Sequence, residues 1–421
     1  MGTHVQIPLR RIVITGVGAI SPFGQGVESL LTGIRDGRSA VVDLSAEWSN
    51  KIPALTCLVG APLPEPLDPK QIERKFRRSM GPTAMMAALA AREAFNQAGL
   101  EGETLASGRV GVSFASTTGS TASLEQSFLH YFQKNFTESL GSSAFFQIMS
   151  HTCAANLAHF FGIRGRVVSP DSACASAAQA IGLGFEAIRY GLQDAMLCGG
   201  ADELHAVVTG CFDLVHASSC RYNDHPDRTP RPFDAGRDGT VCGEGAGALV
   251  LESEASARAR GARILAEVAG FDTVADGGHL AQPLSDSITR CLHNALDNAG
   301  VLPEGIGYVN AHGTGTVLGD AAESQAVVDV FGPQRVAMSS LKGHIGHTLG
   351  ASAALETIVS LDMLTHGYLA PTRNLTEVAA DCVGPDHVTT LRYQRFDAFV
   401  KNCFAFGGIN TVLVVKRYED A

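Results

Sequence analysis

The pattern of apolar and polar positions repeats itself about 200 residues along the chain. Residues 90–100 and 291–301 both read as the end of an amphipathic helix, and Gly99 or Gly300 stands where that helix would stop. In each case a short apolar run follows and leads into a loop rich in Gly and Thr. The repetition predicts two similar strand–loop–helix units.

A second, weaker repetition lies downstream of each of these units. Val167–Ser169 and Val336–Ser339 both read as strands that lead through a loop into a helix, one ending near Gly191 and the other near Gly367. Alternating strands and helices are typical of an α/β fold. Because the period is so long, the pattern predicts a duplicated domain divided near residues 255–262, and not a solenoid.

Length and composition agree with this division. A chain of 421 residues is long for a single core, so we expect an N-terminal half over 1–258 and a C-terminal half over 259–421. With 45% apolar and 18% charged residues, the composition is that of a folded globular protein.

Two Gly-rich segments resemble the start of a dinucleotide-binding turn. Arg11–Gly18 is an apolar run that ends in Gly-x-Gly, and Gly243–Gly247 is a second partial match. The motif needs a third Gly that opens a helix, but Pro22 interferes with a helix after the first segment, and the second precedes its apolar run. We therefore interpret both as close backbone packing and expect no bound nucleotide cofactor.

The charge balance bears on possible partners. A formal net charge of −10 disfavours a broad nucleic-acid surface, which needs a basic patch. Glu73–Arg78 is the best local basic cluster for an acidic protein partner, although a solvated helix end explains it equally well. No apolar run approaches the ~20 residues of a membrane helix, and residues 1–6 lack the features of a signal peptide.

The ten cysteines form no Cys-x-x-Cys pair, so we expect no zinc ribbon, reduced thiols and a cytoplasmic location. Cys174 stands where an apolar strand gives way through small residues to a helix rich in Ala and Gly. A helix N-terminus stabilises a thiolate, which predicts a lowered pKa and a nucleophilic thiol that is the most reactive of the ten. A buried structural cysteine is the competing interpretation.

His312 and His347 occupy matching places in the second half of the chain. Each follows a predicted strand, His312 in a loop with two Gly and two Thr and His347 in a loop that leads into a helix. Pseudo-twofold packing would bring both loops to the Cys174 turn. His344 lies three residues before His347, but no third ligand has suitable spacing, so we expect no metal site.

The last motif is Asn402–Asn410, which carries Phe404, Phe406 and a Gly-Gly pair before a terminal apolar strand. Such a turn could direct backbone N–H groups at an oxyanion while Phe406 covers the site. A plain hairpin with aromatic residues in the core is the alternative.

These motifs occur together in an order that resembles the β-ketoacyl-acyl-carrier-protein synthases of the elongating (type II) kind. The resemblance covers roughly residues 11–416 and is carried by Ala-Cys-Ala-Ser at Cys174, Asn-Ala-His-Gly-Thr-Gly-Thr at His312, Lys-x-x-x-Gly-His from Lys342 to His347, and Phe-x-Phe-Gly-Gly at Phe406. It implies a thiolase-like duplicated fold with five layers, α-β-α-β-α. It also implies a homodimer, or a heterodimer with a chain-length subunit, and substrates carried on the phosphopantetheine of an acyl carrier protein.

The resemblance also assigns roles to residues. Cys174 would hold an acyl group while His312 and His347 donate to the carbonyl of a malonyl thioester that loses CO₂. The oxyanion of the condensation would meet the backbone N–H groups of Cys174 and Phe406. By the same resemblance Lys342 would be an essential cation, with Glu323 and Glu356 as its acidic support. Thr314 and Thr316 would contact the amides of the pantetheine.

Other positions bear on specificity. Thr118 stands where housekeeping enzymes of this family carry a larger apolar residue that lines the acyl pocket, and Phe145 and Phe146 fall where a partner subunit would close that pocket. Phe404 is a further expected substrate contact. A polar residue with added aromatic bulk favours an acyl chain other than a plain saturated one, in either fatty-acid or polyene/polyketide elongation.

Two other functions remain open on the sequence alone. A catalytically silent chain-length partner would look similar but lacks the nucleophile, so Cys174 argues against it. A nucleotide-dependent oxidoreductase would require the Gly-rich segments to bind a cofactor.

Overall fold

The computed structural model describes residues 9–133 and 142–420, so residues 1–6, where the sequence lacks the features of a signal peptide, lie outside the described ranges. Its core is one hydrogen-bonded sheet in which two five-strand sets have the same order and the same pattern of directions. In each set the first strand pairs antiparallel with the second and the second with the third, and the last two continue parallel. The first set is β1 (Ile12–Ser21), β8 (Gly245–Ser253), β7 (Ala195–Asp202), β5 (Val110–Ala115) and β6 (Val167–Val168); the second is β9 (Ala266–Ala275), β16 (Ile409–Lys416), β15 (Ala398–Ala405), β10 (Tyr308–Asn310) and β11 (Ala337–Ser339), with β13 (Asp386–His387) beyond it.

The two sets meet at β1, which pairs with β8 along its length and with β9 over Ile12–Ile14. The predicted duplication is therefore present in the strand order, while the sheet itself runs without a break from one half to the other. The division of the chain into two domains between residues 258 and 259 stays a prediction, since β9 of the second half pairs directly with β1 of the first.

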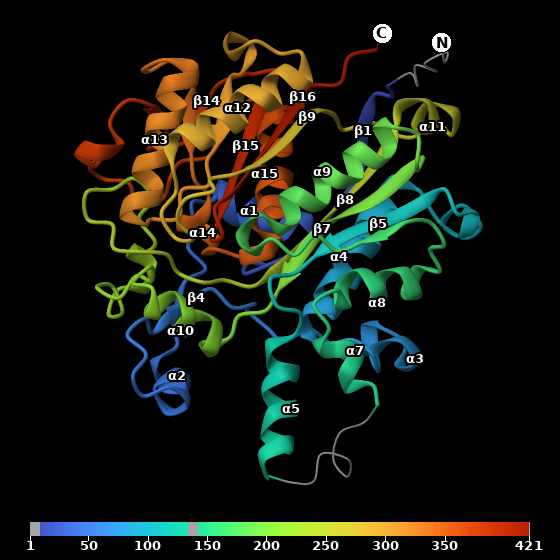
Figure 1. The fold of residues 1–421 in the computed structure, drawn as a ribbon, viewed down its shortest axis with the longest axis horizontal. Coiled ribbons are helices and arrows are strands. Elements are labelled where there is room, and N and C mark those ends of the chain that lie inside the picture. The colour runs from blue at the N-terminus through green and yellow to red at the C-terminus, as the bar shows by residue number, and fades with distance from the viewer. Residues whose placement is uncertain (1–8, 134–141, 421) are drawn as a thin grey trace.

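Helices complete five layers around these strands (Figure 1). The outer helices α4 and α8 cover the first set and α12 and α13 lie over the second, while α9 and α15 contact strands of both sets and fill the middle layer. These helices are α4 (Pro82–Ala98), α8 (Thr152–Phe161), α12 (Ser285–Ala299), α13 (Val317–Phe331), α9 (Ser176–Arg189) and α15 (Ser352–His366). The predicted helix ends at Gly99 and Gly300 are confirmed, because both residues are left-handed C-caps.

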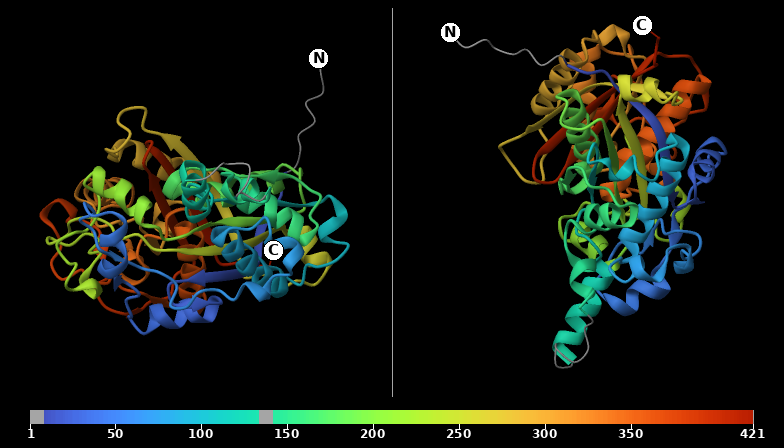
Figure 2. Two further views of the ribbon diagram at one scale, coloured as in Figure 1. Left: turned by 90° about the horizontal axis from the view of Figure 1, so that it is seen from below. Right: turned by 90° about the vertical axis from the view of Figure 1, so that its right-hand side faces the viewer.

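Shorter helices and strand pairs lie around this core. They are α1 (Val27–Arg35), α2 (Ser45–Lys51), α3 (Arg74–Arg77), α5 (Thr121–Gln133), α7 (Ala144–Ile148), α10 (Ala206–Leu214), α11 (Glu254–Ala259) and α14 (Lys342–Ile345), with β2 (Gly24–Gln25) and the pairs β3 (Val42–Asp43) with β4 (Val59–Gly60) and β12 (Tyr368–Leu369) with β14 (Arg392–Tyr393). Helix α5 projects from the body of the molecule (Figure 2).

The Gly-x-Gly segment lies within β1 and is not a turn. A Cβ on Gly16 would stand 2.1 Å from the carbonyl oxygen of Ala94, and one on Gly18 would stand 2.0 Å from that of Ala90. These glycines let α4 pack directly on β1, which confirms the interpretation as close backbone packing. Among the described helices, none is long and apolar enough to cross a membrane.

Candidate active site

Cys174 lies at the tip of a sharp turn between β6 and α9. Its neighbour Ala173 has a φ of +47°, a left-handed conformation that costs a non-glycine residue about 1–3 kcal/mol. Ser176 holds the turn, because its hydroxyl accepts the N–H of Ser172 at 2.9 Å and donates to the carbonyl of Ala173 at 2.7 Å. The predicted elbow is therefore present, and it places the Cys174 thiol in the interior with 5% of its surface exposed.

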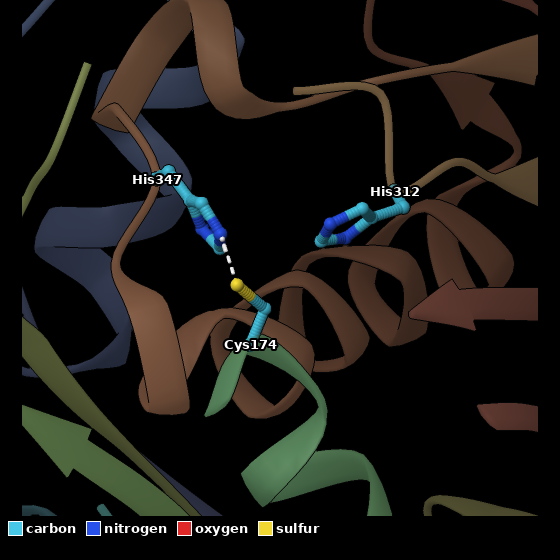
Figure 3. Close-up of side chains that lie close together, drawn as sticks. All are labelled: Cys174, His312 and His347. Atoms are coloured by element: carbon cyan, nitrogen blue, oxygen red, sulfur yellow. Dashed lines mark hydrogen bonds between the residues drawn. The ribbon is translucent and has the colours of Figure 1, made fainter. Parts of the chain in front are cut away.

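His347 points its ring at that thiol (Figure 3). Its Nε2 lies 2.9 Å from Cys174 Sγ, and its Nδ1 accepts the backbone N–H of Leu349 at 3.3 Å and lies 2.9 Å from the hydroxyl of Ser352. Because a backbone N–H can only donate, Nδ1 carries no proton and the proton of the neutral ring sits on Nε2. His347 therefore donates to the sulfur of Cys174.

The segment that carries His347 is fixed on both sides. Its N–H donates to the carbonyl of Val241 at 2.7 Å, and its carbonyl accepts the N–H of Gly243 at 2.9 Å. Leu349 is left-handed, with a φ of +52°, and this conformation turns its N–H back onto the ring. Like Ala173 before α9, Leu349 begins the turn before α15, so equivalent strained turns of the two halves meet at one site.

His312 approaches from the other side, at the end of β10. Its ring stands edge-on to that of His347, with centroids 5.4 Å apart at 84°. Glu323, expected as acidic support for Lys342, instead holds this loop, since its carboxylate accepts the backbone N–H of His312 at 2.8 Å and that of Gly313 at 2.7 Å. The structure thus brings both predicted histidines to the predicted cysteine.

Burial sets the protonation of this group. It raises the pKa of the Cys174 thiol to about 12, an effect increased by the neighbouring Cys403 and opposed by Lys342. The prediction that the helix terminus lowers this pKa is therefore wrong, because desolvation outweighs the helix terminus. Burial, together with the charges of Lys342 and Lys401, lowers the pKa of His347 and of His312 well below its usual value, and His347 itself adds to the effect on His312. Both rings are neutral near pH 7.

A buried ionic network supports the histidines. The Nζ of Lys342 donates to Glu356 Oε1 at 2.7 Å, and both side chains are fully inside the protein. A second lysine, Lys401, lies 2.6 Å from the other oxygen of the same carboxylate. The motifs did not point to Lys401, although a lysine inside the apolar run of β15 was a visible signal.

A cavity of about 220 Å³ opens in front of the three side chains. Its wall includes Thr314 and Thr316, whose hydroxyls lie 2.9 Å apart, together with Phe404 and Phe406. Phe406 is 38% exposed and stands at the turn between β15 and β16, so it is placed to cover the cavity. Phe404 is buried beside His312. The alternative of a plain hairpin with aromatic residues in the core also predicts this burial.

Three expected substrate contacts lie elsewhere in the single chain. Thr118 is exposed, with its hydroxyl 3.1 Å from that of Thr121, and it is outside the cavity wall formed by the described residues. Phe145 and Phe146 lie on α7 with 63% and 48% of their surface exposed. Their roles in an acyl pocket stay predictions that depend on a second subunit.

The arrangement favours acyl chemistry over metal chemistry. The thiol sulfur and one nitrogen of each ring lie within 4.8 Å of one another, close enough to surround an ion. The two buried ammonium groups of Lys342 and Lys401 oppose a dication there. His344, considered above as a partner of His347 in a metal pair, directs its two ring nitrogens at the backbone carbonyls of Arg38 and Pro371.

Comparison with known proteins agrees with this site. Residues 9–257 match the family described as β-ketoacyl synthase, N-terminal domain, and residues 265–376 match its C-terminal domain. The 3-oxoacyl-[acyl-carrier-protein] synthase 1 of Haemophilus influenzae is 35% identical over 415 residues, which cover 98% of this chain and 100% of that protein.

Two solved structures share the fold. A β-ketoacyl synthase from Burkholderia phymatum STM815 matches with a TM-score of 0.93 and 41% identity over 98% of this chain and 100% of that one. The ketosynthase AntDE, solved with the type II polyketide acyl carrier protein AntF and bound to a hexaketide, matches with a TM-score of 0.88 and 29% identity over 98% and 100%.

The hydrogen bond from His347 to the thiol generates a test. Replacing His347 with Phe removes a donor to the Cys174 thiolate, and a hydrogen bond to a charged group contributes about 1.5–3 kcal/mol, so alkylation of Cys174 by iodoacetamide should slow about ten- to hundredfold. Peptide mapping gives the rate at each cysteine, and the exposed Cys211 and Cys220 serve as internal references. His347→Gln, which keeps a donor near the Nε2 position, should retain most of the rate. Equal rates in the Phe variant and the wild type would contradict the assigned tautomer.

Proposed function

This chain belongs to the β-ketoacyl synthase family of acyltransferases, and we propose that it joins an acyl group held on Cys174 to a malonyl group carried by an acyl carrier protein. The product is a β-ketoacyl thioester two carbons longer. The single observation that carries the proposal is the contact of the Cys174 thiol with the Nε2 of a neutral His347, with a second neutral histidine facing the same point.

The first step is a thioester exchange at Cys174. The sulfur attacks the carbonyl of the acyl carrier thioester, the bond to the pantetheine sulfur breaks, and the released pantetheine thiolate takes the proton of Cys174. The raised pKa of the free thiol means that little thiolate is present at rest. The N–H of His347 and the positive charge of Lys342 stabilise the sulfur as it loses its proton.

The second step forms the nucleophile. A malonyl thioester enters with its carbonyl oxygen between the Nε2 positions of His312 and His347, and loss of CO₂ leaves negative charge on that oxygen. A neutral imidazole donates to this charge, and each such donor contributes about 3–4 kcal/mol to the transition state. His312 performs this role with its proton on Nε2, the position at which the fixed Nδ1 acceptor places the proton of His347.

The third step joins the chains. The enolate carbon attacks the acyl-Cys174 carbonyl and the new carbon–carbon bond forms. The bond from that carbonyl to sulfur breaks, and Cys174 leaves as a thiolate that takes one proton from solvent water, the proton that the decarboxylative reaction consumes. The backbone N–H groups of Cys174 and Phe406 serve the oxyanion of this step, and Phe406 closes the cavity. Thr314 and Thr316 offer their hydroxyls to the amides of the pantetheine arm from the cavity wall.

Substrates reach the site on a carrier protein. The name of the Haemophilus influenzae relative and the AntDE–AntF complex both include an acyl carrier protein. In this acidic chain we assign its docking to the basic segment Glu73–Arg78, where Arg74, Lys75 and Arg78 are exposed.

Assembly and specificity follow from the exposed aromatic residues. A second copy of the chain, or a chain-length subunit, would cover Phe145 and Phe146 and close an acyl pocket that includes Thr118. A silent chain-length role for this chain itself is disfavoured, because its thiol and both histidines are assembled. The cytoplasmic location stays a prediction from the ten free thiols.

The half-reactions separate the roles of the three side chains. Cys174→Ala should abolish condensation and leave measurable decarboxylation of malonyl-carrier protein. His312→Ala should still accept an acyl group on Cys174 but decarboxylate about 10²–10³ times more slowly, because a donor to developing charge is lost. His347→Ala should slow both half-reactions, since this ring also touches the thiol.

The assay measures CO₂ release beside acyl-enzyme formation by intact mass for the three variants. If both histidine variants decarboxylate at the wild-type rate and fail only in acylation, the histidines are thiol activators and the proposed second step is wrong.

Docking is tested by charge reversal. Arg74→Glu with Lys75→Glu should raise KM for acyl-carrier protein about tenfold at low salt and leave kcat unchanged, because docking electrostatics act on encounter. The rate with acyl-pantetheine, which lacks the protein, should not change. Arg335→Glu, at an exposed arginine beyond α13, is the matched control. An unchanged KM for the carrier protein would place its docking surface elsewhere.

A further inference from the structure

Lys401 is a second fully buried lysine beside the histidine pair. It lies on β15 with 0% of its side chain exposed. Its Nζ stands 2.6 Å from Glu356 Oε2, while Lys342 binds Oε1 of the same carboxylate. One glutamate is therefore shared by two ammonium groups. Buried ion pairs contribute little to stability compared with well-packed apolar side chains, so packing alone does not account for a cation at this position.

The side chain also holds the loop that carries His312. Its Nζ donates to the carbonyl of Ala311 at 3.3 Å and to that of Asn402 at 2.7 Å. The amide of Asn402 in turn donates to Glu323 at 2.9 Å, and the same carboxylate takes the backbone N–H of His312. Lys401 thus binds the carbonyl of Ala311, just before His312. Its neighbour Asn402 binds the Glu323 carboxylate, which accepts the N–H of His312.

We propose that Lys401 is a positioning residue for the two histidines: it fixes the loop of His312 and supplies a second positive charge beside both rings. The inference rests on the proposed condensation and adds a residue to it. The titratable groups packed around the pair are Lys342 from α14, Lys401 and Cys403 from β15, Glu323 from α13, Glu356 from α15, Cys174 from the turn before α9, and Asp202, which accepts the N–H of Gly350, from the end of β7.

Within this set the two ammonium groups act on the rings in the same direction. Their charges add to burial in lowering the pKa of both histidines. The carboxylate of Glu323 accepts hydrogen bonds from backbone N–H groups, and the carboxylate of Glu356 is paired with the two lysines. Lys401 therefore adds to burial and to the charge of Lys342 in favouring neutral imidazoles, the form that donates to an enolate, at pH values where an ordinary histidine is charged.

The test is the pH dependence of malonyl-carrier-protein decarboxylation. Lys401→Gln keeps N–H donors for the two carbonyls and removes the charge. The acid limb of its pH–rate profile, where the rate falls as the histidines become protonated, should therefore move to higher pH by at least about one unit, which is about a tenfold loss of rate at a given pH on that limb. Lys401→Arg keeps the charge and should retain the wild-type limb. Lys401→Met removes charge and donors and should in addition lower the rate at every pH.

Acylation of Cys174, followed by mass in the same samples, shows that each variant is folded and reports on the proposed function separately. A wild-type protein that neither acylates nor decarboxylates contradicts the proposed function, whatever Lys401 does. A Gln variant with the wild-type acid limb overturns the role of the charge. A second measurement needs no variant: a wild-type acid limb near pH 6.5 would also overturn it.

Discussion

The site depends on one backbone hydrogen bond, from the N–H of Leu349 to Nδ1 of His347. It fixes the tautomer of the ring and so decides that Nε2 carries the proton that faces Cys174. The bond exists because Leu349 adopts a left-handed conformation at the start of the turn before α15. That conformation is costly for leucine, and the surrounding layers, in which every residue of this turn is buried, hold it in place.

Duplication explains why this geometry is available. In each half a left-handed residue and a middle-layer helix come after the last strand of the five-strand set, following a short loop in the first half and helix α14 in the second. In the first half the turn presents the Cys174 thiol, and in the second it orients His347. Because α9 and α15 pack side by side between the two strand sets, the turns meet without a long loop from either half. The same enclosure removes water and keeps both histidines neutral.

The sequence predicted the parts of the site that short motifs carry. The duplicated halves, Cys174, His312, His347 and Lys342 with Glu356 were all identified in the arrangement that the structure shows. Lys401 was missed because its partners, Glu356 and Ala311, are distant in the chain. The pKa of Cys174 was predicted in the wrong direction, since local helix position was visible in the sequence and the depth of burial was not. The roles of Thr118 and Phe145 in an acyl pocket stay predictions, because both side chains are exposed in the single chain and lie outside the wall of the cavity.

The role of both histidines as neutral Nε2–H donors is open to direct measurement by ¹⁵N NMR of protein labelled at the histidine rings. Spectra of His312→Gln and His347→Gln variants assign the two rings among the fourteen histidines. We predict that both rings stay neutral from pH 8 to pH 6, with the proton on Nε2 and Nδ1 unprotonated. An imidazolium signal from either ring near pH 7, or a proton on Nδ1 of His347, would contradict this role.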